Sequence, residues 1–184
     1  IRAIDLGIDF DSIGEAIIMA RRLNIETIGV KNTPDLNSSC DVVLRVKNRY
    51  PVQGNFRQLV VCEDISGIGS KTDLLTIQDF SRIRNDLAKK IRPNLGLEIS
   101  IADARRLDAN ALGRWLSQAK YVYRLCKSAR CQFIISSGAQ SIFGMVSSRT
   151  FESILTMLNI SPANYWAELS AWLDSKDTVR SYVC

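Results

Sequence analysis

Residues 131–139, CQFIISSGA, contain an uninterrupted apolar run from Phe133 to Ile135, followed by two serines and a glycine. A continuous apolar run that ends in small polar residues and glycine is typical of a β-strand buried on both faces. A long amphipathic helix is predicted just before it, over residues 108–130, and two shorter helices after it. This order of helix, buried strand, loop and helix predicts an α/β barrel or a doubly wound sheet.

Apolar runs bounded by turn residues predict six further strands, at residues 1–8, 25–30, 41–46, 58–62, 74–77 and 95–101. Several links between them are too short to hold a full helix, so a parallel sheet must form a trimmed barrel rather than a regular eight-fold one. The sequence therefore predicts a single domain over residues 1–184, an irregular TIM-like (β/α) barrel. No apolar run reaches membrane-spanning length, and no signal peptide is apparent, although position 1 is not methionine.

Positive charge is concentrated in one part of the chain. The whole chain has a net charge of +5, whereas residues 82–149 hold 13 Lys and Arg against 4 Asp and Glu. No acidic residue occurs between Asp108 and Glu152. A concentrated basic region is the expected footprint of a polyanion partner, although basic proteins without such a partner are common.

The chain contains no histidine. Histidine-dependent nucleophilic triads and histidine-rich metal sites are therefore excluded. The five cysteines are scattered and favour reduced thiols over a disulfide framework or a zinc site. The glycines match neither a phosphate-binding loop nor a dinucleotide fingerprint, so we expect no cofactor. The adjacent pair Glu63-Asp64 could bind magnesium only weakly, because neighbouring side chains at a strand end diverge, so we expect no metal.

Several basic residues are expected in loops that follow a strand, on the face where barrels place their functional groups. Two serines at the end of strand 131–139 could add phosphate donors, or could simply satisfy backbone groups at the strand end. The predicted nucleic-acid-binding residues are Lys31, Lys47, Arg49, Lys71, Arg82, Arg105, Arg106, Ser136, Ser137 and Arg149. No catalytic residue is predicted.

Three further features leave alternatives open. Glu98 lies in an apolar strand, so its carboxyl must be neutral, hydrogen-bonded or paired if that face is buried, and a structural role is favoured over catalysis. Residues 142–146 form an apolar loop that is either folded under the barrel or exposed for a partner. Lys120, Arg124 and Lys127 form a basic stripe that is either a solvated helix face or an RNA contact.

The segment from Phe133 to Ala139 resembles the barrel-shaped protein subunit of archaeal and eukaryotic ribonuclease P, protein component three of that enzyme. In that family an aliphatic strand ending in Ser-Ser-Gly-Ala follows a long helix and precedes a loop and two helices. Glu98-Ile99, the pair Arg105-Arg106 and the strand Asp73 to Ile77 also resemble family positions. The likeness covers residues 72–175, and before them it depends on element order alone.

The resemblance implies a distorted barrel like the PHP-type barrel of histidine-rich phosphoesterases, without their metal site. It also implies a complex in which the RNA removes the 5′ leader of precursor tRNA. Implied partners are that RNA, precursor tRNA and a smaller α/β ribonuclease P protein, with room for a higher-order heteromer. The expected location is the cytoplasm for an archaeal protein and the nucleus for a eukaryotic one. The apolar loop departs from the charged loop of relatives, which often bears an arginine, and the next arginine in this chain is Arg149, after the loop.

Three functions remain open at this stage. The first is a non-catalytic RNA-binding and scaffolding subunit of ribonuclease P. The second is a metal-dependent or metabolite-binding barrel enzyme that acts on an anionic substrate. The third is a barrel that serves only as a protein-binding module.

Overall fold

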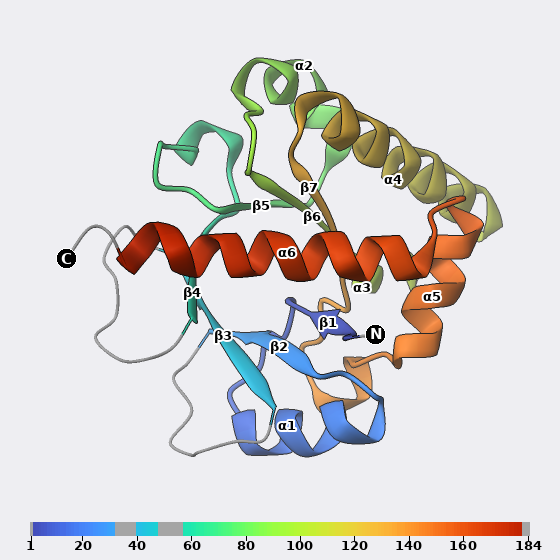
Figure 1. The fold of residues 1–184 in the computed structure, drawn as a ribbon. Coiled ribbons are helices and arrows are strands. Elements are labelled where there is room, and N and C mark those ends of the chain that lie inside the picture. The colour runs from blue at the N-terminus through green and yellow to red at the C-terminus, as the bar shows by residue number, and fades with distance from the viewer. Residues whose placement is uncertain (1, 32–39, 48–56, 182–184) are drawn as a thin grey trace.

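A ring of parallel strands forms the centre of the molecule. The computed structural model describes residues 2–31, 40–47 and 57–181. Seven strands pair in parallel with their neighbours along the chain and form a nearly closed barrel (Figure 1). They are β1 Ile4–Asp5, β2 Thr27–Val30, β3 Asp41–Val46, β4 Arg57–Cys62, β5 Leu74–Ile77, β6 Gly96–Ser100 and β7 Gln132–Ser136.

Helices cover the barrel unevenly. In the described part of the chain, α1 (Ile13–Arg22) connects β1 to β2 and α2 (Phe80–Lys90) connects β5 to β6. The short α3 (Ile101–Ala104) and the long α4 (Ala109–Ala129) connect β6 to β7. The link from β4 to β5 holds only a 3₁₀ turn, η1 (Ile65–Gly67). The predicted α/β barrel with trimmed connections is therefore confirmed.

The barrel closes between β7 and β1 at one level only. Ile8 pairs in parallel with Ala139, whose backbone N–H donates to the Gly7 carbonyl at 2.9 Å. Closer to the start of β7, the Ile135 N–H donates to the Tyr165 hydroxyl at 2.9 Å. A side chain thus takes the place of a neighbouring strand, which satisfies a buried backbone donor where the ring is open.

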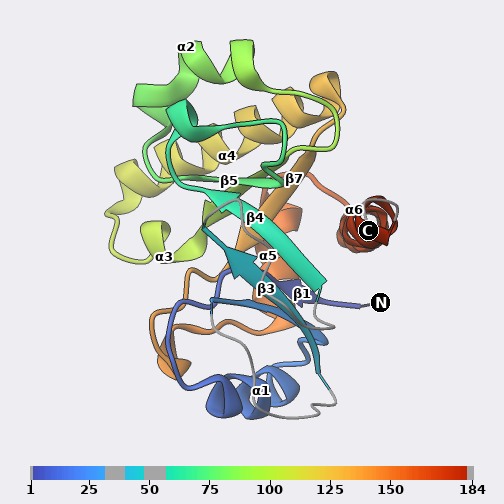
Figure 2. The same ribbon diagram turned by 90° about the vertical axis from the view of Figure 1, so that its left-hand side faces the viewer.

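The last helix, α6 (Pro162–Ser181), lies across the amino-terminal ends of the strands. Asp174 is 3.2 Å from the Arg57 guanidinium at the start of β4, and the Trp172 indole donates to the Asn94 carbonyl just before β6 at 2.9 Å. Figure 2 shows α6 end-on at this end of the barrel, with α3 at the opposite end. The helices η2 (Ile142–Gly144) and α5 (Ser148–Met157) lead from β7 to it.

Gly138 is required at the turn after β7. Its φ is +63°, a left-handed value that side chains rarely adopt. A Cβ there would also overlap the Ser100 hydroxyl, whose oxygen accepts from the Ala102 N–H at 3.1 Å and caps α3. The glycine of the predicted strand end therefore allows β7 to pass close to the start of α3.

Candidate functional site

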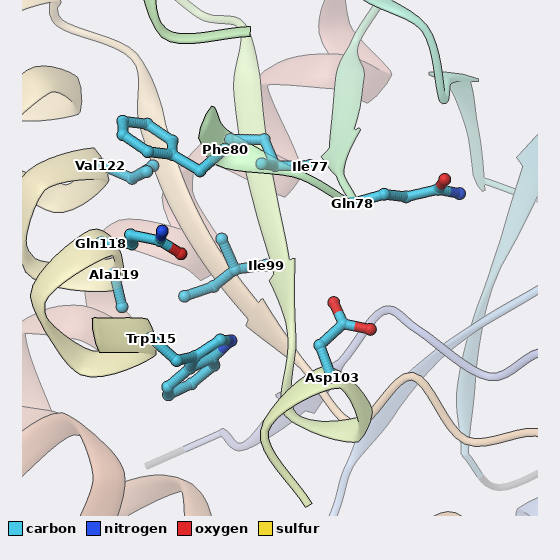
Figure 3. A pocket seen from close by; sticks show the side chains of 9 residues that line it. All are labelled: Ile77, Gln78, Phe80, Ile99, Asp103, Trp115, Gln118, Ala119 and Val122. Atoms are coloured by element: carbon cyan, nitrogen blue, oxygen red, sulfur yellow. The ribbon is translucent and has the colours of Figure 1, made fainter. Parts of the chain in front are cut away.

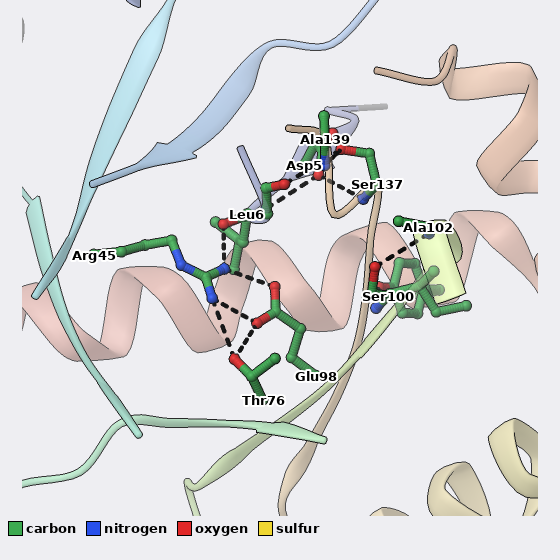
Figure 4. A network of polar contacts seen from close by, with 12 residues as sticks. Asp5, Leu6, Arg45, Thr76, Glu98, Ser100, Ala102, Ser137 and Ala139 are labelled. Carbon is green, nitrogen blue, oxygen red and sulfur yellow. Dashed lines mark hydrogen bonds and ion pairs between the residues drawn. The ribbon is translucent and has the colours of Figure 1, made fainter. Parts of the chain in front are cut away.

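A buried ion pair occupies the interior of the barrel (Figure 4). Arg45 of β3 contacts Glu98 of β6 with both guanidinium arms, Nη1 to Oε1 at 2.6 Å and Nη2 to Oε2 at 2.7 Å. Thr76 of β5 donates to Glu98 Oε2 at 2.7 Å, and the Arg45 guanidinium also donates to the Leu6 carbonyl. Strands on opposite sides of the ring are thus joined through its centre.

The charges of this pair are stabilised in their ionised forms. The Glu98 side chain is 1% exposed and that of Arg45 is 11% exposed. Burial by itself raises the pKa of Glu98, but the Arg45 guanidinium and the hydroxyls of Thr76 and Ser136 outweigh it and lower the pKa below its ordinary value. The Glu98 carboxylate is therefore paired, as its place in an apolar strand required, and its oxygens are engaged within the barrel.

A second carboxyl, that of Asp5 in β1, lies close to this pair. Its Oδ1 accepts from the backbone N–H groups of Gly7 and Ser137, at 3.1 and 2.9 Å. Its Oδ2 is buried and has no hydrogen-bond partner among the described residues. Burial raises the pKa of the Asp5 carboxyl above its ordinary value, against the opposing effect of these hydrogen bonds.

The two serines predicted as phosphate donors are buried. Ser136 is 2% exposed and Ser137 is fully covered. The Ser137 hydroxyl accepts from the Ala139 N–H at 3.2 Å, and Ser136 contributes a hydrogen bond to Glu98. Because the turn at the end of β7 is folded into the barrel seam, both serines satisfy internal groups, as the second of the two predicted alternatives has it. Their burial contradicts the other alternative, in which their hydroxyls donate to a phosphate.

Two predicted lysines lie at the carboxyl-terminal end of the barrel, each beside an acidic residue. Lys31, just after β2, forms an ion pair with Asp9. Lys47, just after β3, is 2.9 Å from Glu63. Both lysines are exposed, but the carboxylates of Asp9 and Glu63 balance much of their charge. Arg49 lies outside the described residues.

Arg105 and Arg106 follow α3 and are exposed. Neither has an acidic partner in the part of the chain that the structure describes. Asp108, the nearest acidic residue that follows them, caps α4 by accepting from the Ala111 N–H at 2.8 Å. Among the predicted and described residues near the carboxyl-terminal ends of the strands, this pair therefore remains available to an anion. Arg82 lies in the first turn of α2, and its side chain is outside the described part.

Two other predicted residues lie at the opposite end of the barrel. Lys71 is three residues before β5. The Arg92 guanidinium, two residues after the end of α2, donates to the flanking Ser70 carbonyl at 3.1 Å. Arg149 is in the first turn of α5, where the Ser148 N–H donates to the Leu23 carbonyl at the end of α1. The prediction that both share the carboxyl-terminal face is therefore wrong, because their loops have already returned to the amino-terminal end.

Part of the apolar loop of residues 142–146 is folded under the barrel and part is exposed, so each of the two predicted alternatives holds for one part. Met145 and Val146 are buried, whereas the Phe143 side chain is 87% exposed. The carboxyl-terminal half of the loop is folded into the core, and one aromatic ring remains on the surface.

A small pocket lies where β5 and β6 end beneath α4 (Figure 3). Its walls include Phe80, Trp115, Gln78 and Gln118, and Asp103 is its one carboxylate. Burial raises the pKa of Asp103. No lysine or arginine lines this pocket, so an anionic metabolite would meet a carboxylate instead of a cation. This pocket is therefore poorly suited to a phosphorylated ligand.

Within residues 2–31, 40–47 and 57–181, no cluster of three potential metal-ligating side chains is found. No helix in this part of the chain is long and apolar enough to cross a membrane.

The sequence did not identify Arg45 as a structural centre. A signal was available, since an arginine in the apolar strand β3 and a glutamate in the apolar strand β6 are complementary charges that burial forces to meet. The predicted basic stripe also separates in the structure: Lys127 pairs with Glu168 of α6 at 2.6 Å, whereas Arg124 is exposed without a described partner.

Comparison of the chain with protein-family models and with curated proteins yields no match.

Proposed function

We propose that the chain is a non-catalytic RNA-binding subunit of ribonuclease P that supports the catalytic RNA in removing the 5′ leader of precursor tRNA. The observation that favours this function most is the separation of charges. The cation inside the barrel is neutralised by Glu98, whereas Arg105, Arg106 and the arginines of α4 are exposed without described acidic partners. Phosphate backbones are the ligand class that such a surface attracts.

The barrel interior supports a role without catalysis. Barrel enzymes place reactive groups at the carboxyl-terminal ends of the strands. Among the described residues, the Glu98 carboxylate and the Arg45 guanidinium inside the ring bind each other, and Asp5 Oδ1 accepts from two backbone N–H groups. The proposal therefore includes a PHP-type barrel whose interior is rebuilt as a structural ion pair, with the RNA supplying the chemistry.

The proposed partners are the ribonuclease P RNA, precursor tRNA and a smaller α/β protein of the same complex, with a higher-order heteromer as an extension. The proposed location is cytoplasmic for an archaeal-type protein and nuclear for a eukaryotic one. These proposals follow from the resemblance of residues 133–139 and their surroundings to that family.

Salt titration of RNA binding tests the proposal. Neutralisation of several phosphates predicts that affinity falls steeply as salt rises, with a slope of log Kd against log salt of about 0.7–0.9 per phosphate contact. The variant Arg105→Ala/Arg106→Ala is expected to lower this slope by about 1–2 and to leave the circular dichroism spectrum unchanged, because both side chains are exposed. Unchanged affinity would remove this pair from the interface.

Reconstitution provides the functional test. Leader removal by the catalytic RNA and its partner proteins is expected to be faster, or to need less Mg²⁺, when this chain is present. Phosphoester hydrolysis by the purified chain alone with an added divalent metal would contradict the proposal and favour the enzyme hypothesis.

A further inference from the structure

The outer side of α4 presents positive charge without opposing charge. The helix has 21 residues, so it is about 30 Å long. None of its side chains is acidic. Arg114, Tyr121 and Arg124 follow each other at spacings of seven and three residues and therefore share one helix face. Arg114 and Arg124 are exposed and have no acidic partner among the described residues.

Helix α2 adds an arginine to the same face. The Arg84 guanidinium lies over the Tyr121 ring, 5.1 Å from its centroid, and Phe80 meets the same ring edge-on at 5.2 Å. Asp86, two residues further along α2, points about 200° away from Arg84 around the helix axis. The tyrosine therefore holds a cation at the surface between two helices and away from the nearest carboxylate of α2.

This arrangement limits the ligand class. A guanidinium held against an aromatic face has fewer conformations to lose when it binds a phosphate. Tyr121 is 38% exposed, and its ring already contacts Phe80 and Arg84. The surface therefore suits backbone contacts that do not depend on base identity.

We infer that Arg84, Arg114 and Arg124 form a track for the phosphate backbone of folded RNA, which begins at Arg105-Arg106 and continues along α4, with Tyr121 as the residue that positions Arg84. This inference depends on the proposed RNA-binding function and extends its site beyond the strand-end loops. It also chooses between the two alternatives for Arg124, in favour of RNA contact.

The test compares two triple variants that lose the same charge. Binding of two labelled RNA hairpins of unrelated sequence is measured between 50 and 300 mM salt. Arg84→Ala/Arg114→Ala/Arg124→Ala is expected to lower the salt slope by about 2–3 for both hairpins. The matched control is Lys71→Ala/Lys127→Ala/Arg149→Ala, which removes two exposed cations at the amino-terminal end of the barrel and one on α4 that is already paired with Glu168. It is expected to change the slope by less than about 1.

The positioning role of Tyr121 has its own readout. Tyr121→Leu is expected to weaken binding about three- to ten-fold, because the ring beneath Arg84 is lost. Tyr121→Phe keeps that ring and is expected to bind within two-fold of the wild type. Equal weakening by both variants would overturn the positioning role.

The outcomes separate the two proposals. If the wild type binds neither hairpin, the proposed RNA-binding function fails and the track fails with it. If the wild type binds with a steep salt slope but the control triple lowers it as much as the α4 triple, the track alone is overturned. Circular dichroism and urea unfolding of each triple confirm that folded protein is compared.

Discussion

Two ion pairs in this molecule have the same length and opposite surroundings. Arg45 and Glu98 approach to 2.6 Å inside the barrel, where their side chains are 11% and 1% exposed. Lys127 and Glu168 also approach to 2.6 Å, between α4 and α6, but their side chains are 50% and 46% exposed. Because water screens the second pair and not the first, the distance alone says little about how much each contributes to stability.

The buried pair joins strands that are far apart in the ring, whereas the exposed pair joins two helices that already pack on the same strand. Removing a partner inside leaves an uncompensated charge without water, and removing one outside leaves a charge that water solvates. Breaking each pair in turn is therefore the sharpest way to test the comparison.

The largest effect is expected from Arg45→Met. Glu98 would keep its buried position without a cation, which costs about 3–5 kcal/mol of the free energy of unfolding in comparable cases. Urea unfolding at pH 7 measures this loss. A loss below about 1 kcal/mol would show that water reaches the interior.

The double variant Arg45→Met/Glu98→Met tests whether the loss comes from the orphaned charge. We expect it to recover much of the stability, since replacing a buried pair with apolar side chains of similar volume is often neutral. A double variant as unstable as the single one would instead assign the loss to packing.

The difference in the free energy of unfolding between Arg45→Met and the wild type is expected to be smaller at acid pH than at pH 7. The pKa of Glu98 in the wild type is lowered, so its stabilising effect is present above the pKa of the unfolded chain and is lost as pH falls through the folded pKa. In the variant, burial without Arg45 raises the pKa of Glu98. Protonation at acid pH then removes the cost of burying an unpaired carboxylate. Unfolding at pH 7 and pH 4 gives the comparison.

A smaller effect is expected from Asp5→Asn. Because burial raises the pKa of Asp5 above its ordinary value of 3.8, the folded wild type binds this proton more tightly than the unfolded chain and loses stability as pH rises through the folded pKa. The amide keeps the Oδ1 acceptor for Gly7 and Ser137 and cannot ionise. The amide nitrogen would replace Oδ2, which has no partner among the described residues, so an unpaired buried donor offsets part of the gain. Urea unfolding should show the stability of the variant relative to the wild type rising by about 1 kcal/mol from pH 4 to pH 7.

The smallest effect is expected from Lys127→Ala. An exposed pair of this kind contributes about 0.5 kcal/mol or less, which corresponds to a change in Tm of about 2 °C or less. Thermal unfolding at low and high salt measures it, and salt should reduce the difference further. A loss comparable to that of Arg45→Met would show that burial does not distinguish the two pairs.

Local patterns predicted much of the fold. The strands β3 and β5 have the predicted bounds, and α4 begins and ends within one residue of the prediction. These elements have clear apolar patterns and clear boundary signals, such as the Asp108 cap at the start of α4. The irregular barrel also followed from links too short to hold helices.

The parts that could not be predicted depend on contacts between distant residues. A rule that places loop residues after a strand does not say which end of the barrel they reach when the link contains no long helix, and Lys71 was misplaced for that reason. Ser136 and Ser137 lie at the end of a strand as predicted, but the closure against β1 that buries them depends on contacts far along the chain. The pairing of Arg45 with Glu98 spans 53 positions, beyond the reach of local patterns.

The position of α6 has a consequence for the order of folding. Its contacts connect the end of the chain to residues far earlier, since Trp172 binds Asn94, 78 positions away, and Asp174 pairs with Arg57. A growing chain on the ribosome can form β1 to β7 before this helix emerges, but the amino-terminal ends of the strands stay uncovered until it does. The barrel should therefore acquire its full resistance to proteolysis only after α6 has left the ribosome and docked, as a late and non-local step.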